Sequence, residues 1–132
     1  MITAVTQFAV VVRDYDEAIA FYRGVLGFTL LEDVDMGNGK RWVRVGPAGG
    51  GGATILLARG VNERQLSRVG DQTGGRVFIF LETSDCRGDY ERMRAAGVRF
   101  RGEPREEAYG TVVVFEDLYG NLFDLIQRRR GA

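Results

Sequence analysis

The chain has 132 residues, 45% of them hydrophobic and 27% charged, which fits one globular domain or two small halves sharing a core. Eighteen basic residues balance 18 acidic ones, so neither a nucleic acid nor an acidic membrane surface is expected as the main partner. No apolar run has transmembrane length and no basic region precedes the first one, so we expect no membrane segment. The single cysteine, Cys86, excludes an intrachain disulfide and fits a reducing cytoplasm.

The sequence contains no histidine. This excludes histidine as a catalytic acid or base, as the partner of a serine or cysteine nucleophile, and as a zinc or iron ligand. Any metal site would have to be built from oxygen ligands, which suit hard cations best.

The first half of the chain predicts a strand, a helix and three more strands. A β-branched run at 6–14 indicates the first strand. Asp14 and Glu17 form a capping-box pattern, and Gly27 is a natural helix end. The three further strands are predicted at 28–35, 41–47 and 53–59. The glycine-rich stretch 46–53 leads into a strand rather than a helix, so a hairpin loop is favoured over a phosphate-binding loop.

The second half repeats this order. A strand is predicted at 75–83, and a helix capped by Ser84 or Asp85 follows, ending at Gly97. Strands are then expected at 99–104, 109–117 and 121–127. The predicted fold class is α+β: two βαβββ modules, each a bent mixed sheet, around a cleft.

The expected organisation is a single domain over residues 1–132. It consists of a first module at 1–60, a connector at 61–75 that is polar and rich in glycine, and a second module at 76–132. Neither module has enough core to be stable easily alone. Clefts between repeats are favoured places for small ligands.

The strand "NLFDLIQ" carries an acid at its centre. Strand alternation puts Asp124 on the same face as Leu122 and Ile126. A carboxylate on an apolar face is costly unless something pairs with it. The sequence leaves three partners open: a metal, a ligand, or an arginine such as Arg41 or Arg44.

Three other stretches carry candidate residues with equally ordinary structural explanations. In "GKRWVRV", Trp42 and Arg44 face one way and Arg41 faces the other, so a ring and a guanidinium could face a cleft or could be core and surface residues. Tyr109 follows a charged stretch that is a loop over a cleft or a solvated connector. Cys86 shares a helix face with Tyr90 and Met93, which indicates a buried hydrophobic side chain.

The segments "VVVRDYDEAIAFYRGVLGF", "RWVRVGP" and "YGTVVVFEDLYGNLFDLI" resemble those of the vicinal oxygen chelate superfamily, which includes glyoxalase I, bleomycin and fosfomycin resistance proteins and extradiol dioxygenases. The resemblance covers essentially the whole chain. It implies a metal in the cleft, with ligand positions that fall on Gln7 and Asp124. The matching position in the second module falls on Val77 or Phe78, and "TILLA" offers no donor, so the implied metal site is incomplete.

The resemblance and the missing donors favour a binding protein of the bleomycin-resistance kind. It would bind a small organic ligand in a cleft between modules or subunits, as a cytoplasmic homodimer, with no cofactor expected and a divalent metal left open. The ligand contacts would come from rings and polar groups of both modules: Arg41, Trp42, Arg44, Phe78, Phe80, Tyr109 and Asp124. The alternative is a glyoxalase-like lyase or isomerase, or a dioxygenase-like enzyme, either metal-dependent or metal-free with Asp124 as the catalytic base.

Overall fold

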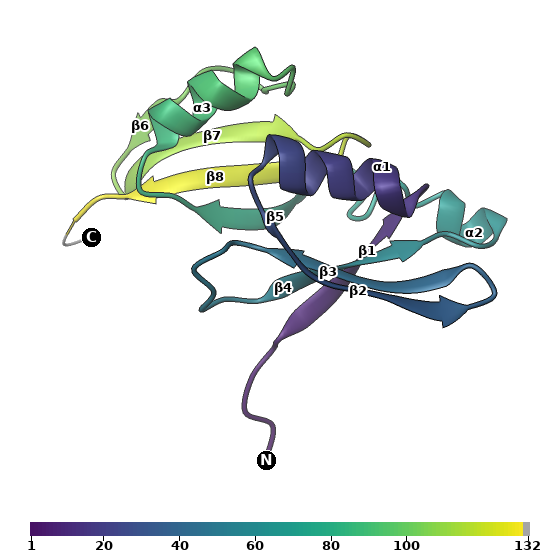
Figure 1. The fold of residues 1–132 in the computed structure, drawn as a ribbon. Coiled ribbons are helices and arrows are strands. Elements are labelled where there is room, and N and C mark those ends of the chain that lie inside the picture. Colours follow the sequence, from purple (N-terminus) through teal and green to yellow (C-terminus); the bar gives the residue numbers. More distant parts are fainter. Residues whose placement is uncertain (131–132) are drawn as a thin grey trace. The chain divides into compact units, whose positions relative to one another are not determined.

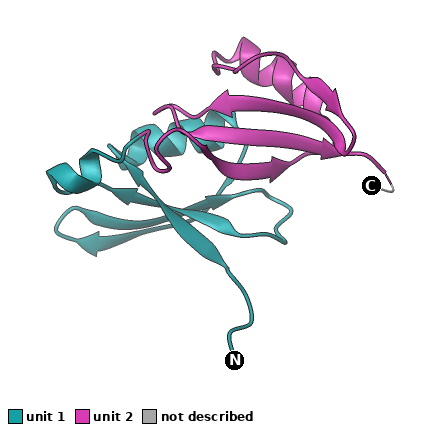
Figure 2. Cartoon of the chain, turned by 180° about the vertical axis from the view of Figure 1, so that it is seen from behind, with its two compact units in different colours: residues 1–69 teal, residues 70–132 magenta. Residues whose placement is uncertain are grey.

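A computed structural model describes residues 1–130 of the chain. It divides the chain into two compact units, residues 1–69 and residues 70–132 (Figure 2). Each unit contains one four-stranded mixed sheet with a helix on one of its faces (Figure 1). The predicted α+β class and the two βαβββ modules are confirmed.

In the first unit the strand order is β1-β4-β3-β2, with β1 and β4 parallel and the other pairs antiparallel. The elements are β1 (Gln7–Val12), α1 (Tyr15–Ile19), the π-helix η1 (Ala20–Val25), β2 (Thr29–Gly37), β3 (Lys40–Gly46), β4 (Thr54–Arg59) and α2 (Glu63–Leu66). The capping prediction is confirmed, because the Asp14 side chain accepts a hydrogen bond from the Glu17 amide.

In the second unit the order is β5-β8-β7-β6, which repeats the first topology strand for strand. The elements are β5 (Val77–Glu82), α3 (Cys86–Ala95), β6 (Arg105–Glu107), β7 (Gly110–Glu116) and β8 (Leu122–Arg128). Of the two predicted caps, Asp85 is the residue whose side chain accepts from the amide three residues on, that of Gly88.

The core of each unit lies between its sheet and its helix. In the second unit Phe123 stacks on Phe115, and Phe115 contacts Phe100, which in turn meets Tyr90 of α3 edge-to-face. Both Phe115 and Phe123 are fully buried. In the first unit the buried strand residues alternate in the same way, and they are Val10, Val12, Val43, Val45, Ile55 and Leu57. We call the face of a sheet that packs against its helix the helix side, and the opposite face its open face.

Three local predictions need correction. The first helix is not one regular α-helix, since it changes at Ala20 to a π-helix with wider hydrogen-bonded turns. The connector contains the one-turn helix α2, capped by Asn62. The strand predicted at 99–104 was wrong: only Phe100 makes an isolated bridge there, and the edge strand is β6, in the charged stretch that the sequence indicated as a loop.

Among residues 1–130 no helix combines the length and apolarity needed to cross a lipid bilayer.

Candidate functional site

The open face of the second sheet brings Asp124 together with an aromatic ring. Asp124 is the direct neighbour of Phe80 on β5 and of Val114 on β7. Residues directly opposite each other in a sheet share a face, so these three side chains emerge side by side. Phe123 and Leu125 point to the helix side, which confirms that Asp124 lies on the face of Leu122 and Ile126.

The Asp124 carboxylate has no side-chain partner in the part of the chain that the structure describes. It is half-buried, and no hydrogen bond or ion pair reaches it among residues 1–130. Burial raises the pKa of this carboxyl above its ordinary value, and the charge of Arg105 opposes that rise. A half-buried acid that the protein itself leaves unpaired is free to accept a hydrogen bond from a ligand.

The ring beside it is presented to solvent. The side chain of Phe80 is 65% exposed, although it lies in the middle of a strand. Phe78 is half-buried and lies where the β5–β8 register shifts. Tyr109 follows β6 and is 40% exposed. An exposed aromatic side chain next to an unpaired acid is typical of a ligand-contacting surface rather than of a core.

Arg105 is the arginine that the structure places near Asp124. It lies opposite Val112, which in turn lies opposite Ile126, so all three occupy the open face. Its Nε donates to Glu107 at 2.8 Å. The hydrogen bond with Glu107 raises the pKa of Arg105 most, and the charges of Glu107 and Asp124 add to that rise, while burial opposes it. The sequence had pointed to Arg41 or Arg44 instead.

The open face of the first sheet carries a paired polar cluster. Trp42 Nε1 and Arg44 Nε both donate to Glu32 Oε1, at 3.2 and 2.5 Å. Arg44 also donates to Thr54 Oγ1 at 3.0 Å, and Thr54 is the direct neighbour of Gln7 on β1. The bonds from Arg44 and Trp42 lower the pKa of Glu32, while burial opposes them. This cluster is therefore held in place by its own hydrogen bonds.

Arg41 lies on the other side of the same sheet. Its guanidinium binds Asp33 and Asp16 at 2.7 and 2.9 Å and stacks over the Tyr15 ring at 5.1 Å. Its backbone amide donates to the Tyr15 hydroxyl at 3.1 Å. The predicted split of Arg41 from Trp42 and Arg44 is confirmed, and these contacts tie Arg41 to α1 rather than to the open face.

The oxygen donors do not fit a metal site within either unit. Gln7 belongs to the first unit and Asp124 to the second, and the strand neighbours of Asp124 are Phe80 and Val114, which offer no donor. Among residues 1–130 no three His, Cys, Asp or Glu side chains gather closely enough to hold an ion. A cation held by one carboxylate would need several further ligands.

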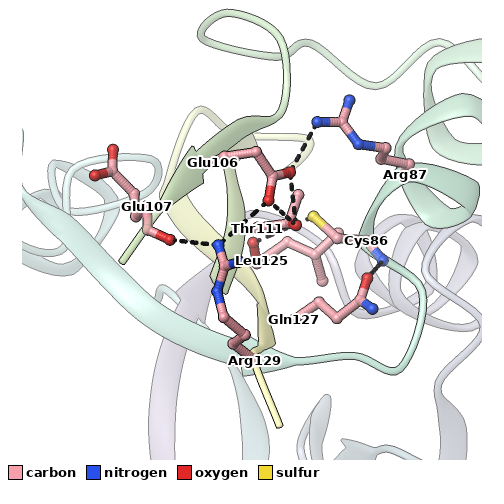
Figure 3. A network of polar contacts seen from close by, with 8 residues as sticks. All are labelled: Cys86, Arg87, Glu106, Glu107, Thr111, Leu125, Gln127 and Arg129. Carbon is pink, nitrogen blue, oxygen red and sulfur yellow. Dashed lines mark hydrogen bonds and ion pairs between the residues drawn. The ribbon is translucent and has the colours of Figure 1, made fainter. Parts of the chain in front are cut away.

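Cys86 belongs to a structural network on the helix side (Figure 3). Its backbone amide donates to Gln127 at 2.9 Å, and its thiol lies 3.6 Å from the Leu125 carbonyl. Around it, Glu106 accepts from Thr111 and pairs with Arg87 at 2.9 Å. Cys86 is fully buried, and burial raises the pKa of its thiol. The prediction that Cys86 is a buried hydrophobic residue is confirmed.

Sequence reasoning missed Arg105 and Glu32. Arg105 lies in a stretch rich in charge, where nothing in the residue order says which charge turns toward the acid. A signal for Glu32 existed, since a hairpin centred on residues 37–40 places it near Arg44.

Comparisons with known proteins agree with this fold. The family model described as "Glyoxalase/Bleomycin resistance protein/Dioxygenase superfamily" matches residues 4–125. An uncharacterised protein of Shewanella frigidimarina is 51% identical over 125 residues, which cover 94% of this chain and 93% of that protein.

Two solved structures are similar over nearly their whole length. The structure of UcmS2 is 33% identical with a TM-score of 0.83, and covers 96% of this chain and 98% of its own. The structure of TnmS3, described as an antibiotic-binding protein from Streptomyces sp. CB03234, is 29% identical with a TM-score of 0.77, and covers 97% and 98%.

Proposed function

Because this chain belongs to the glyoxalase/bleomycin resistance protein/dioxygenase superfamily, we propose that it binds a small organic ligand on the open face of its second sheet. Asp124 is the polar anchor and Phe80 the ring against which an aromatic ligand packs. The observation that carries the proposal is the unpaired, half-buried Asp124 carboxylate directly beside an exposed ring. The antibiotic-binding description of TnmS3 supports the same class of ligand.

The open face suits a ligand that is flat, apolar and positively charged or rich in N–H groups. Its centre consists of Val112, Val114 and Ile126 around Asp124. Val112 and Ile126 are already buried, so a ring gains apolar contact area by packing on Phe80 and Val114, while a donor on the ring satisfies the acid. A cation gains most, since a charge-assisted hydrogen bond to a carboxylate is about twice as strong as a neutral one.

The first sheet carries a second candidate contact surface, on its own open face. Glu32 already fixes Trp42 and Arg44. Binding a ligand there would therefore cost these two side chains little conformational freedom. In the second unit, Tyr109 adds an exposed ring with a hydroxyl, and Phe78 adds a half-buried ring. Arg41 lies on the helix side of its sheet and its guanidinium is held by Asp16 and Asp33, so it would contact a ligand only on that side.

The test is calorimetric titration with three matched probes: naphthylmethylamine, naphthalenemethanol and naphthoate. The amine should bind tightest and the carboxylate weakest. Asp124→Asn should weaken binding of the amine by about tenfold or more and change the affinity for the alcohol little, since the substitution removes the charge of the side chain and keeps its shape. Phe80→Ala should weaken all three alike. Glu91→Gln on α3 is the matched control, because it removes an exposed carboxylate from the other side of the unit.

A preference that does not depend on the charge of the probe, or an Asp124→Asn protein that binds the amine as wild type does, would remove Asp124 from the ligand site. If the Phe80→Ala protein bound the probes as tightly as the wild type does, the Phe80 ring would not be part of the ligand site.

The raised pKa of Asp124 also supports a second candidate, a metal-free lyase or isomerase with Asp124 as general base, because a base works best near the ambient pH. Turnover of the glutathione hemithioacetal of methylglyoxal, followed in the wild type and in Asp124→Asn, tests it. Turnover equal in both proteins, or none in either, rejects this candidate.

We propose a homodimer as the working form, located in the cytoplasm. The edge strand β2 exposes Leu31, Val34 and Met36, which supports burial against another chain. The single buried, free Cys86 is compatible with a reducing compartment. Sedimentation equilibrium gives the mass directly, and a monomer at micromolar concentration would reject the dimer.

A further inference from the structure

A small cavity opens at one end of the open face of the second sheet. It has a volume of about 220 Å³ and lies where residues 70–76 meet the turn at 117–121. Leu122 forms part of its wall and lies two residues before Asp124 on the same face of β8. At about 3.3 Å per residue, the cavity therefore begins roughly 7 Å from Asp124 along the strand. The proposed ligand anchor does not use it.

Two arginines, Arg76 and Arg101, are among the residues that line this cavity. No ion pair holds Arg76 among residues 1–130. Arg101 donates to Glu116 through Nε alone, at 3.0 Å. A guanidinium has five N–H donors, so the terminal groups of Arg101 remain available. Asp71 is the acid in the lining and Glu116 pairs with Arg101, so the charge available to an anion comes chiefly from Arg76.

The walls of the cavity are fixed by a buried hydrogen-bond network. One carboxylate oxygen of Asp117 accepts from the amides of Tyr119 and Asn121, and the other accepts from the Asn121 side chain, each at 2.9 Å. Asp117 and Asn121 are only 5% and 3% exposed. The Asn121 side-chain oxygen in turn accepts from the amide of Gln72 at 3.5 Å, which joins the loop to the turn.

Gly70 brings the loop still closer to the turn. Its φ is +77°, and a Cβ placed there would lie 2.0 Å from the Tyr119 carbonyl oxygen. Only glycine permits this approach, so the backbone on both sides of the cavity is held before any ligand arrives. A preformed cavity of this size, with Arg76 in its lining, accommodates a small ion together with a few water molecules.

We infer that this cavity is an anion-binding subsite that takes a carboxylate or phosphate group, with Arg76 and Arg101 as its charged contacts. Arginine forks match the paired oxygens of both groups. The subsite lies next to the open face of the second sheet, so one ligand that carries both a ring and an oxyanion could reach Phe80 and the subsite together. It goes beyond the proposed function, since a free oxyanion without any ring is sufficient to occupy it.

The experiment is an NMR titration of the ¹⁵N-labelled full chain with inorganic phosphate and, separately, with acetate, each balanced with sodium chloride to constant ionic strength. Saturable shifts are expected at the amides of residues 70–76 and 120–121, with α3 unaffected. Arg76→Gln and Arg101→Gln should each weaken binding by about fivefold to tenfold. Arg94→Gln, on α3 over the Tyr90 ring, removes the same charge from the helix side and should leave the affinity unchanged.

Each outcome decides the inference. Binding of phosphate alone, of acetate alone, or of both supports the subsite and identifies its oxyanion. No saturable shift, or equal weakening by all three arginine variants, overturns it, because the signal would then reflect general surface charge. Arg101→Gln also removes the ion pair with Glu116. If the Arg101→Gln protein unfolds for that reason, Arg76→Gln decides the test. Neither probe carries a ring, so failure of the Asp124 proposal leaves this test unaffected.

Discussion

Asp124 and Phe80 stand directly opposite each other in the parallel pair of β8 and β5, the acid half-buried and unpaired, the ring 65% exposed. Each side chain is unfavourable where it stands: the acid is partly removed from water, and the ring is left in it. A single aromatic cation would relieve both. The same two side chains therefore lower the stability of the free protein and favour binding of such a ligand.

Asp124→Asn should stabilise the free protein at neutral pH. Burial raises the folded-state pKa of Asp124 above its ordinary value of 3.8, so the charged form is disfavoured in the folded state and its cost grows as the pH rises through the folded pKa. Urea unfolding from neutral pH to about pH 4 should show the gain shrinking toward zero. A gain that does not depend on pH would contradict this origin.

Glu32→Gln should have the opposite effect and lower the stability of the protein at neutral pH. The hydrogen bonds from Arg44 and Trp42 lower the pKa of Glu32 below its ordinary value of 4.5. Its contribution to stability is therefore present above that ordinary value and is lost as the pH falls through the lowered one. The variant should be less stable than the wild type at neutral pH, and the two unfolding curves should converge in acid. A variant as stable as wild type at neutral pH would mean that the Arg44 pair contributes nothing measurable.

Gly70→Ala should destabilise the second unit by at least about 1–3 kcal/mol, the cost of a strained backbone conformation. The new Cβ would meet the Tyr119 carbonyl at 2.0 Å, with φ at +77°. Gly52→Ala is the control, because nothing lies within 4 Å of a Cβ there and its φ is not in the left-handed region. Thermal unfolding compares the two. Equal melting temperatures would show that the loop can move away from the turn at no cost.

Removal of divalent metal should leave the melting temperature unchanged. Within the second unit the strand neighbours of Asp124 offer no further donor, and among residues 1–130 no three His, Cys, Asp or Glu side chains gather closely enough to hold an ion. The measurement is elemental analysis of protein purified without chelator, followed by melting with and without EDTA and with Mn²⁺, Ni²⁺, Zn²⁺ or Mg²⁺ added. A near-stoichiometric metal, with melting lowered by EDTA and restored by one ion, would mean that donors come together in a way that a single unit does not provide.

The sequence predicted the repeated topology because its signals are local. Helix caps at Asp14 and Asp85, the left-handed glycines Gly27 and Gly97, and strand alternation each depend on residues close together in the chain. The same alternation placed Asp124 correctly on its face. The expected edge strand at 99–104 failed since edge strands are short and charged, and so look like loops.

The surroundings of Asp124 could not be predicted in the same way. Phe80 and Arg105 come from strands 44 and 19 residues away in the sequence, and which of 18 basic residues approaches an acid depends on strand register. The cavity at 70–76 is also invisible to local patterns, because one wall comes from a connector and the other from a tight turn.

The division of the second sheet into a helix side and an open face has an evolutionary consequence. On β7 and β8 the residues that hold the core, such as Phe115 and Phe123, alternate with those that face outward, such as Val114 and Asp124. Substitutions at every second position can therefore change what the protein recognises while the packing that folds it stays intact. Ligand preference can diverge between relatives on this scaffold one outward residue at a time.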